Sequence, residues 1–371
     1  MPDNKPTLLV IPGDGIGPEV IRQAVRVVEW FEENRQIAFD IRDGALGVAT
    51  YRRTGAMLPD ETVSDAQAAD AVLFGAIGGD GYEDIPIEVR RESGLLALRK
   101  KLGLFANIRP AVAFDELLDA SSLKPEVVRG VDLIIVRELS SGIYFGEPRG
   151  IEDLGNGVQR GFNTMQYTTP EIQRVARLSF ELARGRRNHL CSIEKSNVLE
   201  TSKLWRADVR KLHTAEFADV ELTELIVDAA AMQLIRYPRQ FDVIVTGNMF
   251  GDILSDAAAM LTGSLGMLPS ASLSEPDASG RRNALYEPVH GAAPDIAGRD
   301  IANPLAAILS FAMALRHSFD AADDADLLEG AVKDAVAGGV RTPDIKGDVT
   351  RTVSTTEMGD AVLTALDRRA G

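Results

Sequence analysis

Residues 241–256, FDVIVTGNMFGDILSD, decide the kind of fold that the chain can form. The run Phe241–Thr246 is short, β-branched and mainly apolar, which predicts a buried strand of a parallel sheet. Glycines bound the turn Gly247–Gly251 that follows, and a helix is expected after it. Open α/β sheets bind their ligands beyond the carboxyl ends of the strands. The residues after this strand are therefore the first candidates for a functional site.

The expected helix carries two aspartates, Asp252 and Asp256, four residues apart. This spacing places both carboxylates on one helix face, where their repulsion costs roughly 0.2–0.5 kcal/mol. One interpretation is a solvated face near the helix N-terminus, where acidic side chains are favourable. The other is a divalent cation that both carboxylates hold. The stretch by itself leaves the two open.

Composition limits the class of protein. The 371 residues are 45% hydrophobic and 26% charged, as in an ordinary globular protein with two lobes or one large domain. The net charge of −15 disfavours nucleic acid and anionic membranes as partners, whereas a local arginine cluster can still bind a small anion. The single cysteine, Cys191, excludes an intramolecular disulfide and is expected in the core. Without a signal-like N-terminus or a long apolar run, a cytoplasmic location is expected.

Strands and helices alternate along the chain, which predicts an α/β protein with a mainly parallel sheet. The segment IPGDGIGPE at 11–19 has glycines spaced G-x-G-x-G, and no acid stands at a strand end about 20 residues on, as a Rossmann fingerprint requires. We therefore expect a tight strand–helix turn near a ligand. Ser140–Gly161 has no helical pattern and is predicted to form two strands that reach a second subunit. Glu221–Ile235 is expected to be a helix.

Three arginines stand at the ends of expected elements, namely Arg99 on a helix, Arg109 before a proline and Arg137 after an apolar strand. Each guanidinium can hold one carboxylate through two parallel hydrogen bonds, so together they suit a dicarboxylate. A solvated side chain is the alternative for each of them.

Four more side chains have both a structural and a chemical interpretation. Lys195, at the end of an apolar strand, is either half of a structural ion pair or a base. Asp228, in the middle of an expected helix, either faces water or supplies a third cation ligand. Tyr144 is either a core aromatic or a phenol that donates a proton. His290 is either a loop histidine or a contact to adenine, with Asp295 accepting from the ribose hydroxyls.

Eight motifs in order along nearly the whole chain resemble those of the isocitrate/isopropylmalate dehydrogenase family, which are β-hydroxyacid oxidative decarboxylases. They are IPGDGIGPE (11–19), ESGLLALR (92–99), FANIRP (105–110), VRELSSGIYFG (136–146), EKSNVLE (194–200), VDAAAMQL (227–234), GNMFGDILSD (247–256) and EPVHGAAPDIAG (287–298). The resemblance implies a two-domain α/β fold like that of isopropylmalate dehydrogenases, with mostly parallel mixed sheets and no Rossmann domain. Residues 1–104 plus 263–371 would form the cofactor-side domain. Residues 105–262 would bind substrate and metal and form the dimer, with an arm at about 140–165.

The resemblance also implies roles for the candidate side chains. Arg99, Arg109, Arg137 and Asp228 would bind the substituted malate. Asp252 and Asp256, with Asp228 of a second subunit, would hold Mg²⁺ or Mn²⁺. Lys195, also of the second subunit, would remove the hydroxyl proton as hydride passes to NAD⁺. Tyr144 would protonate the enolate left by loss of CO₂. The active sites would be shared within a homodimer.

The family's cofactor contacts map onto two loops and a few residues near them. NAD⁺ would lie along Gly79, Glu92, Asn197, Glu287, His290, Gly291, Ala293, Asp295, Ile296 and Asn303. The pair Asp295-Ile296 resembles the NAD⁺-selective form, since an acid there repels the extra phosphate of NADP⁺.

An apolar wall of Leu95, Leu96 and Val198 would favour the isopropyl group of (2R,3S)-3-isopropylmalate. The products would be 2-oxoisocaproate and CO₂, in leucine biosynthesis. A sister enzyme for another 3-alkylmalate, for tartrate or malate, or for homoisocitrate is the alternative. A non-catalytic regulatory subunit is disfavoured because the whole set of reactive side chains is present. Two departures from the family pattern are Glu194, in place of aspartate, and the loop GGDGYEDIP at 78–86.

Overall fold

The computed structural model describes residues 5–35, 37–349 and 351–371. The chain forms two compact units. The first comprises Met1–Leu104, Val112–Gly130 and Ala259–Gly371, and the second comprises Phe105–Ala111 and Val131–Ala258. The predicted division placed 105–262 in one domain, whereas residues 112–130 and 259–262 cluster with the first unit. The assignment of cofactor and substrate to these units stays a prediction.

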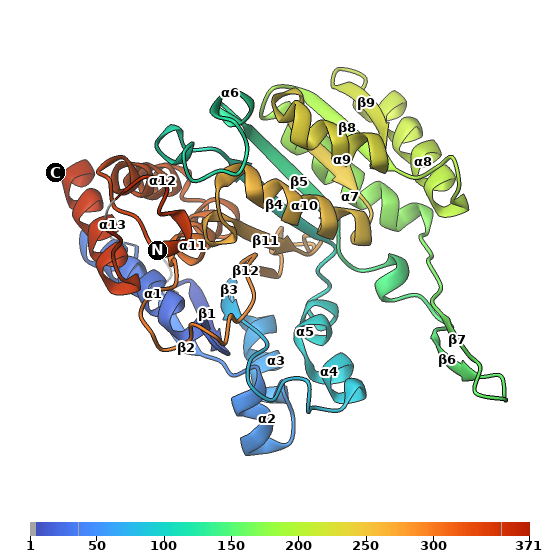
Figure 1. Ribbon diagram of the computed structural model, residues 1–371, viewed down its shortest axis with the longest axis horizontal. Helices are drawn as coiled ribbons and strands as arrows, with labels where there is room; N and C mark the ends of the chain where they lie inside the picture. The colour runs from blue at the N-terminus through green and yellow to red at the C-terminus, as the bar shows by residue number, and fades with distance from the viewer. Residues whose placement is uncertain (1–4, 36, 350) are drawn as a thin grey trace. The chain divides into compact units, whose positions relative to one another are not determined.

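The first unit is a sheet covered by helices (Figure 1). Its strands lie in the order β2-β1-β3-β12-β11. Neighbouring strands from β2 to β12 are parallel, and β11 is antiparallel to β12. The strands are β1 Thr7–Gly13, β2 Asp40–Asp43, β3 Ala71–Ala76, β11 Pro269–Leu273 and β12 Ala284–Pro288. The helices are α1 Gly17–Asn34, α2 Val48–Thr54, α3 Asp60–Ala68, α4 Ile87–Ser93, α5 Leu95–Lys101, α6 Pro125–Val128, α11 Leu305–His317, α12 Ala322–Ala337 and α13 Thr355–Ala370.

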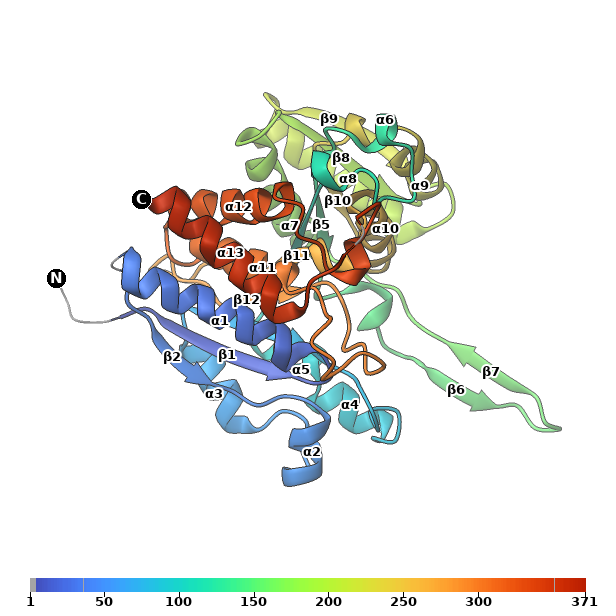
Figure 2. The same cartoon turned by 60° about the vertical axis from the view of Figure 1, so that its left-hand side comes forward.

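Apolar runs explain how this unit packs. Strand β3, AVLFGA, is buried along its whole length, as expected for a central parallel strand covered on both faces. Helix α11 is buried from Leu305 to Leu315 and contacts α1, α12 and the strands β11 and β12. A helix that is apolar all round belongs inside a protein. It forms the core of the first unit (Figure 2).

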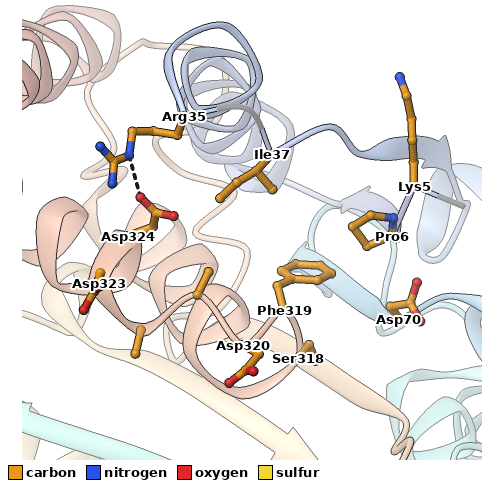
Figure 3. Close-up of a pocket in the computed structure, with 12 residues that line it drawn as sticks. Lys5, Pro6, Arg35, Ile37, Asp70, Ser318, Phe319, Asp320, Asp323 and Asp324 are labelled. Carbon is orange, nitrogen blue, oxygen red and sulfur yellow. Dashed lines mark hydrogen bonds and ion pairs between the residues drawn. The ribbon is translucent and has the colours of Figure 1, made fainter. Parts of the chain in front are cut away.

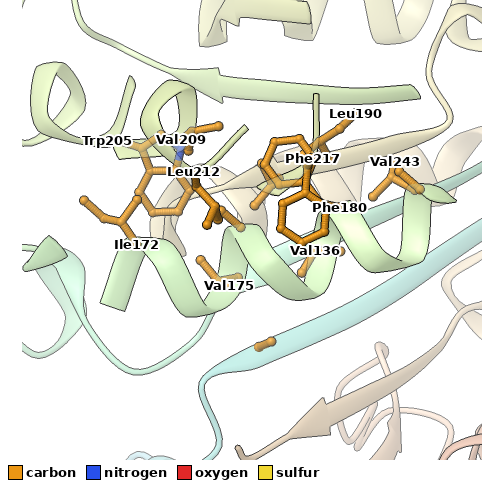
Figure 4. Packing of buried hydrophobic residues seen from close by; sticks show 14 of the residues in the cluster. Val136, Ile172, Val175, Phe180, Leu190, Trp205, Val209, Leu212, Phe217 and Val243 are labelled. Carbon is orange, nitrogen blue, oxygen red and sulfur yellow. The ribbon is translucent and has the colours of Figure 1, made fainter. Parts of the chain in front are cut away.

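The second unit has strands in the order β4-β5-β10-β8-β9, with β10 parallel to both of its neighbours and β8 parallel to β9. These strands are β4 Ala106–Val112, β5 Asp132–Glu138, β8 His189–Glu194, β9 Glu221–Ile226 and β10 Val243–Thr246. The helices are α7 Thr169–Arg184, α8 Glu200–Glu216, α9 Val227–Arg236 and α10 Asn248–Thr262. Helices α7 and α8 bury an apolar cluster against the sheet, in which Phe180 stacks on Phe217 (Figure 4).

The segment after β5 forms a hairpin of two exposed antiparallel strands, β6 Gly150–Asp153 and β7 Gln159–Phe162. It stands out from the rest of its unit in both views (Figures 1 and 2). The two strands were predicted, and their reach to a second subunit stays a prediction.

The predicted α/β class with a mostly parallel sheet is confirmed, and two local predictions were wrong. Glu221–Ile235 is not one helix, because its alternating first half, ELTELI, pairs with β8 as strand β9. Asp228 therefore lies in the first turn of α9, where an acid is favourable, and not in mid-helix. Helix α10 begins at Asn248, so Gly251 is part of its first turn.

Within the described residues, no helix has the combination of length and apolar character that crossing a bilayer needs.

Candidate active site

Arg137 organises a buried polar cluster in the second unit. It is the second-last residue of β5 and forms an ion pair through Nη1 with Asp252 Oδ1. Its Nε and Nη2 donate to Asn248 Oδ1 at 3.0 and 2.7 Å. A Cβ added at Gly251 would lie 2.7 Å from the Arg137 Cβ. Glycine at this position thus lets the first turn of α10 approach the arginine closely.

Arg109 binds the same helix from β4. Its Nη1 donates to Ser255 Oγ at 2.7 Å and to Asp256 Oδ1 at 3.1 Å, and its Nη2 lies 3.5 Å from Asp252 Oδ1. Both guanidinium groups are largely buried. Two arginines therefore offset the repulsion between Asp252 and Asp256. Neither the solvated helix face nor the cation site, the two interpretations of the sequence, included these arginine partners.

Tyr144 completes this cluster by donating its hydroxyl to Asp252 Oδ2 at 2.9 Å. Its ring also lies against the Arg137 guanidinium, with 5.5 Å between the guanidinium carbon and the ring centroid. Burial raises the pKa of the Tyr144 phenol, and the hydrogen bond to Asp252 and its charge raise it further. The phenol is thus kept protonated, as a proton donor must be.

Burial also raises the pKa of Asp256, an effect that Arg109 opposes and the Asp252 charge reinforces. Asp252 is about one-third exposed and Asp256 more than half. Both side chains thus remain partly open to solvent, from which a cation can approach.

Lys195 and Asp228 form a separate pair in the same unit. Lys195 follows β8, and its Nζ lies 2.5 Å from Asp228 Oδ1 in the first turn of α9. The hydrogen bond from Lys195 lowers the pKa of Asp228. Within the described residues no group of three acidic, histidine or cysteine side chains could hold a metal ion, so one chain does not assemble the predicted aspartate triad. Its completion by a second subunit stays a prediction.

The third arginine, Arg99, lies in the first unit on α5. It is buried and donates through Nη2 to Glu287 Oε1 of β12 at 2.5 Å. The sequence predicted a substrate role for Arg99 and a cofactor role for Glu287, but not this pair. Leu95 and Leu96 begin the same helix and are partly exposed.

Other predicted cofactor residues of the first unit lie in its loops. The Nδ1 of His290 is 3.0 Å from the Gly291 carbonyl, and its Nε2 is buried with no hydrogen-bond partner. Burial lowers the pKa of His290 and keeps the ring neutral. Asp295 is exposed, whereas Asn303 is buried and uses its side chain to cap α11 through Leu305 N and to reach Asp344.

The remaining predicted residues are exposed or lie in a loop. Gly79 has a φ of 135°, which glycine adopts without strain, and Glu92 is exposed at the end of α4. In the second unit, Asn197 and Val198 are exposed in the turn between β8 and α8. A cavity of 720 Å³ in the first unit, lined by residues that include Arg35, Phe319 and Asp324, contains none of the predicted site residues (Figure 3).

Asn248 is a residue of this cluster that the sequence analysis did not single out. Its side chain is fully buried and therefore has no surface open to a ligand. Its Oδ1 accepts from Arg137, and its Nδ2 donates to the Ser141 carbonyl at 3.0 Å. Its backbone N–H donates to the Tyr167 hydroxyl at 2.8 Å. An asparagine between a strand and a helix is typically a cap, so nothing local indicates a bridge to Arg137.

The chain is similar to known proteins over nearly its whole length. Residues 7–362 match the family described as isocitrate/isopropylmalate dehydrogenase. A 3-isopropylmalate dehydrogenase of Paramagnetospirillum magneticum is 59% identical over 97% of this chain and 98% of its own. That of Cereibacter sphaeroides is 58% identical over 98% of both. A crystal structure of isocitrate dehydrogenase from Methylococcus capsulatus is similar with a TM-score of 0.83 and 33% identity, over 97% of this chain and 99% of that one.

Proposed function

The chain belongs to the isocitrate/isopropylmalate dehydrogenase family, and we propose that it oxidises and decarboxylates 3-isopropylmalate with NAD⁺ and a divalent cation. The observation that carries the proposal is the Asp252 carboxylate, which two arginines and the Tyr144 phenol surround. A dicarboxylate substrate needs the arginines, a cation needs the aspartate, and decarboxylation needs a proton donor. One cluster contains all three.

Asp252 and Asp256 fit a magnesium or manganese ion. Their carboxylate oxygens are hard donors on one helix face, and both keep exposed surface. Mg²⁺ is commonly held by one or two carboxylates together with water and substrate oxygens. When bound, the cation would polarise the substrate hydroxyl and carbonyl oxygens and stabilise negative charge during loss of CO₂. We propose that Asp228 of a second subunit completes the site.

The chain's own side chains would act on the substrate in order. Arg109 and Arg137 orient the malate carboxylates with bidentate hydrogen bonds, and Arg99 contributes a third guanidinium. Lys195 of a second subunit, once its own proton has passed to solvent, would accept the proton of the C2 hydroxyl, and NAD⁺, when bound, would be the acceptor for the hydride that C2 loses. The C3–carboxylate bond then breaks to release CO₂. Tyr144 supplies the proton that C3 gains.

The first unit supplies features that suit NAD⁺. With His290 Nδ1 donating to the Gly291 carbonyl, the neutral ring offers the lone pair of its buried Nε2 as an acceptor. The amino group of adenine is a matching donor. The exposed carboxylate of Asp295 suits the two ribose hydroxyls and would repel a 2′-phosphate.

Isocitrate is the second candidate substrate, because the enzyme of known structure from Methylococcus capsulatus is named for it. Isocitrate carries a third carboxylate where isopropylmalate has an apolar group. Leu95 and Leu96 offer no hydrogen bond to such a group, and a buried carboxylate without a partner is strongly disfavoured. This favours the alkyl-substituted malate.

The experiment is NADH formation, followed by absorbance, with Mg²⁺ or Mn²⁺ present. It compares isopropylmalate with isocitrate, homoisocitrate, tartrate and malate at equal concentration. Isopropylmalate should give the highest kcat/KM. Efficient turnover of another acid with none of isopropylmalate would contradict the proposed substrate, and no turnover of any would contradict the enzymatic function itself.

We also propose a homodimer. Large apolar side chains are exposed on the hairpin, on α9 and on α10 of the second unit, with Ile151, Met232 and Ile253 exposed by 60% or more. Large apolar side chains exposed on three elements of one unit support a surface that another protein covers. A second copy of the chain would also bring its own Lys195 and Asp228 to the cluster around Asp252.

A further inference from the structure

The turn Pro12–Gly17 between β1 and α1 lies directly against two other segments of the first unit. Its backbone N–H groups at Asp14 and Ile16 donate to the carbonyls of Ala76 and Ala292, each at 2.8 Å. At Gly13 and Gly15, where φ is 76° and 58°, an added Cβ would lie 1.9 and 2.0 Å from those same two carbonyl oxygens. Glycine is therefore required here by the close approach of backbone to backbone.

Asp14 holds the first of these segments through its side chain. The buried carboxylate accepts from Val48 N at 2.9 Å and from Gly78 N at 3.2 Å. Burial raises the pKa of Asp14, and these backbone hydrogen bonds oppose the shift. Gly78 directly precedes Gly79, a predicted contact of the cofactor. Asp14 therefore fixes the loop that starts at the end of β3.

Glu19, in the first turn of α1, holds the second segment with both oxygens. Its Oε1 accepts from Gly298 N and its Oε2 from Asp300 N, each at 3.1 Å. The loop that runs from Ala292 to Asp300 is thus anchored at one end by Ile16 N and at the other by Glu19. Asp295-Ile296, which the sequence assigns to the adenosine end of NAD⁺, lies between the two anchors.

The two loops are both held by the segment between β1 and α1, and they also lie next to each other. A Cβ added at Gly78 would lie 3.7 Å from the Ala292 Cβ, which is ordinary van der Waals distance. A change in either carboxylate therefore changes the spacing of two adjacent loops, while β1 and α1 keep their own hydrogen bonds and apolar contacts.

We propose that Asp14 and Glu19 are positioning residues, which hold the Gly78 loop and the Ala292–Asp300 loop at the spacing that a nicotinamide dinucleotide requires. They thereby set its affinity and, through Asp295, the preference for NAD⁺ over NADP⁺. This inference rests on the proposed function, because that function places the cofactor on these loops. Neither carboxylate needs to touch the nucleotide.

The chemistry of the amide makes the inference testable. A carboxylate accepts from both loop N–H groups, one on each oxygen, whereas glutamine has one carbonyl oxygen and an NH₂ group that would face the second N–H. Glu19→Gln therefore releases one anchor at almost unchanged volume. In Asp14→Asn one carbonyl oxygen must serve both Val48 N and Gly78 N, which both lie near Oδ2, and the NH₂ group then faces the Val48 N–H from which Oδ1 accepted. Glu29→Gln, an exposed position on the same helix, is the matched control.

The experiment measures NADH binding by fluorescence titration, and the kinetics with each substrate varied in turn. For Glu19→Gln and Asp14→Asn we expect Kd for NADH and KM for NAD⁺ to rise about tenfold, the effect of roughly one net hydrogen bond. Both kcat and KM for isopropylmalate should stay within about twofold of the parent protein, a difference below ~0.5 kcal/mol. The ratio of kcat/KM for NAD⁺ to that for NADP⁺ should fall with Glu19→Gln, and Glu29→Gln should change nothing.

Hydrogen exchange gives a readout that does not depend on the cofactor. In Glu19→Gln the amides of Gly298 and Asp300 should exchange faster, while those of α1 keep their protection. If they do and NADH affinity is unchanged, the inference is overturned. It is also overturned if all kinetic parameters and the melting temperature decline together, since this is a structural defect only. A parent protein that binds no NADH overturns the proposed function as well, whereas a parent that binds and variants that bind equally overturn the inference alone.

Discussion

Asn248 joins two groups that the proposed reaction uses at different steps. Its carboxamide oxygen accepts from the guanidinium of Arg137, and its Nδ2 donates to the carbonyl of Ser141, three residues before Tyr144. One buried side chain therefore holds both Arg137 and the segment that leads to Tyr144, the residues to which the proposed reaction gives substrate binding and proton donation. Buried polar side chains whose hydrogen bonds are all satisfied fix a single geometry.

We expect Asn248→Ala to weaken substrate binding more than stability. Removing the acceptor of two Arg137 N–H groups costs about 1–3 kcal/mol, and the arginine loses its fixed direction. KM for isopropylmalate should rise at least about tenfold, at ~1.4 kcal/mol per tenfold, measured by steady-state kinetics beside a thermal melt. Asn34→Ala, which removes an exposed amide at the end of α1, is the control. A KM equal to that of the parent would show that Arg137 is oriented without Asn248.

Cys191 gives a pH dependence of stability. Burial raises the pKa of its thiol from 9.0 to about 11, an effect that a hydrogen bond with Thr223 partly opposes. Between these pH values the unfolded chain loses the proton and the folded protein keeps it, so stability falls as pH rises. The loss approaches roughly 2–3 kcal/mol above pH 11, at ~1.4 kcal/mol for each pKa unit.

Cys191→Ala removes this titration. We therefore expect the difference in free energy of unfolding between parent and variant to shrink as pH rises from 9 to 11. Urea unfolding at several pH values measures it. A difference that stays constant over this range would mean that the folded protein ionises the thiol as readily as the unfolded chain.

At the scale of elements, strand β10, its turn and helix α10 show how far the sequence predicts the structure. The buried strand, the following helix and the shared face of Asp252 and Asp256 all follow from residue types and periodicity. The arginine partners do not, since Arg109 and Arg137 are more than a hundred residues away along the chain. The same is true of Arg99 and Glu287, which come from elements 188 residues apart.

The prediction of a single helix over Glu221–Ile235 failed for a local reason. A period-2 segment and a period-3.6 segment adjoin without glycine or proline between them, so the helical pattern of the second half was extended over the first. Residues 221–226 form a strand because they pair with β8, and such pairing depends on the rest of the sheet and not on the local sequence. The error placed Asp228 in the middle of a helix, where an aspartate is unfavourable, whereas the first turn of α9 is a favourable position for an acid.

The contact between α10 and β5 gives a prediction at this scale. In Gly251→Ala the new methyl group would lie 2.7 Å from the Arg137 Cβ and 3.1 Å from its Cα. Alanine is the better helix former by about 1 kcal/mol, but overpacking of this kind costs about 1–3 kcal/mol. We expect a net loss of stability in thermal melts and a larger loss of kcat/KM, because α10 and Arg137 move apart.

Gly185→Ala is the control for this substitution. Gly185 has a φ of −78° and its added Cβ would meet nothing closer than 3.6 Å. That variant should be as active as the parent. If Gly251→Ala is equally active, the approach of α10 to Arg137 is not needed for the reaction.

At the scale of the whole molecule, the two halves of the proposed chemistry lie in separate clusters of each chain. Asp252 is bound by Arg137 and Tyr144, while Lys195 is bound by Asp228. If each active site takes Asp252 from one subunit and Lys195 from the other, two inactive variants will complement each other. The pair to mix is Lys195→Met and Asp252→Asn, each inactive as a homodimer.

In the mixed dimer one site receives both defects and the other receives neither. A statistical mixture contains about half mixed dimers, and each has one intact site of two, so activity should return to about a quarter of the parent's. Co-expression with two different tags and tandem purification isolates the mixed dimer, whose activity should be about half. Two Lys195→Met subunits with different tags are the control. If instead each chain built its own site, every site in the mixed dimer would carry one defect, and the purified mixed dimer would be as inactive as either parent variant.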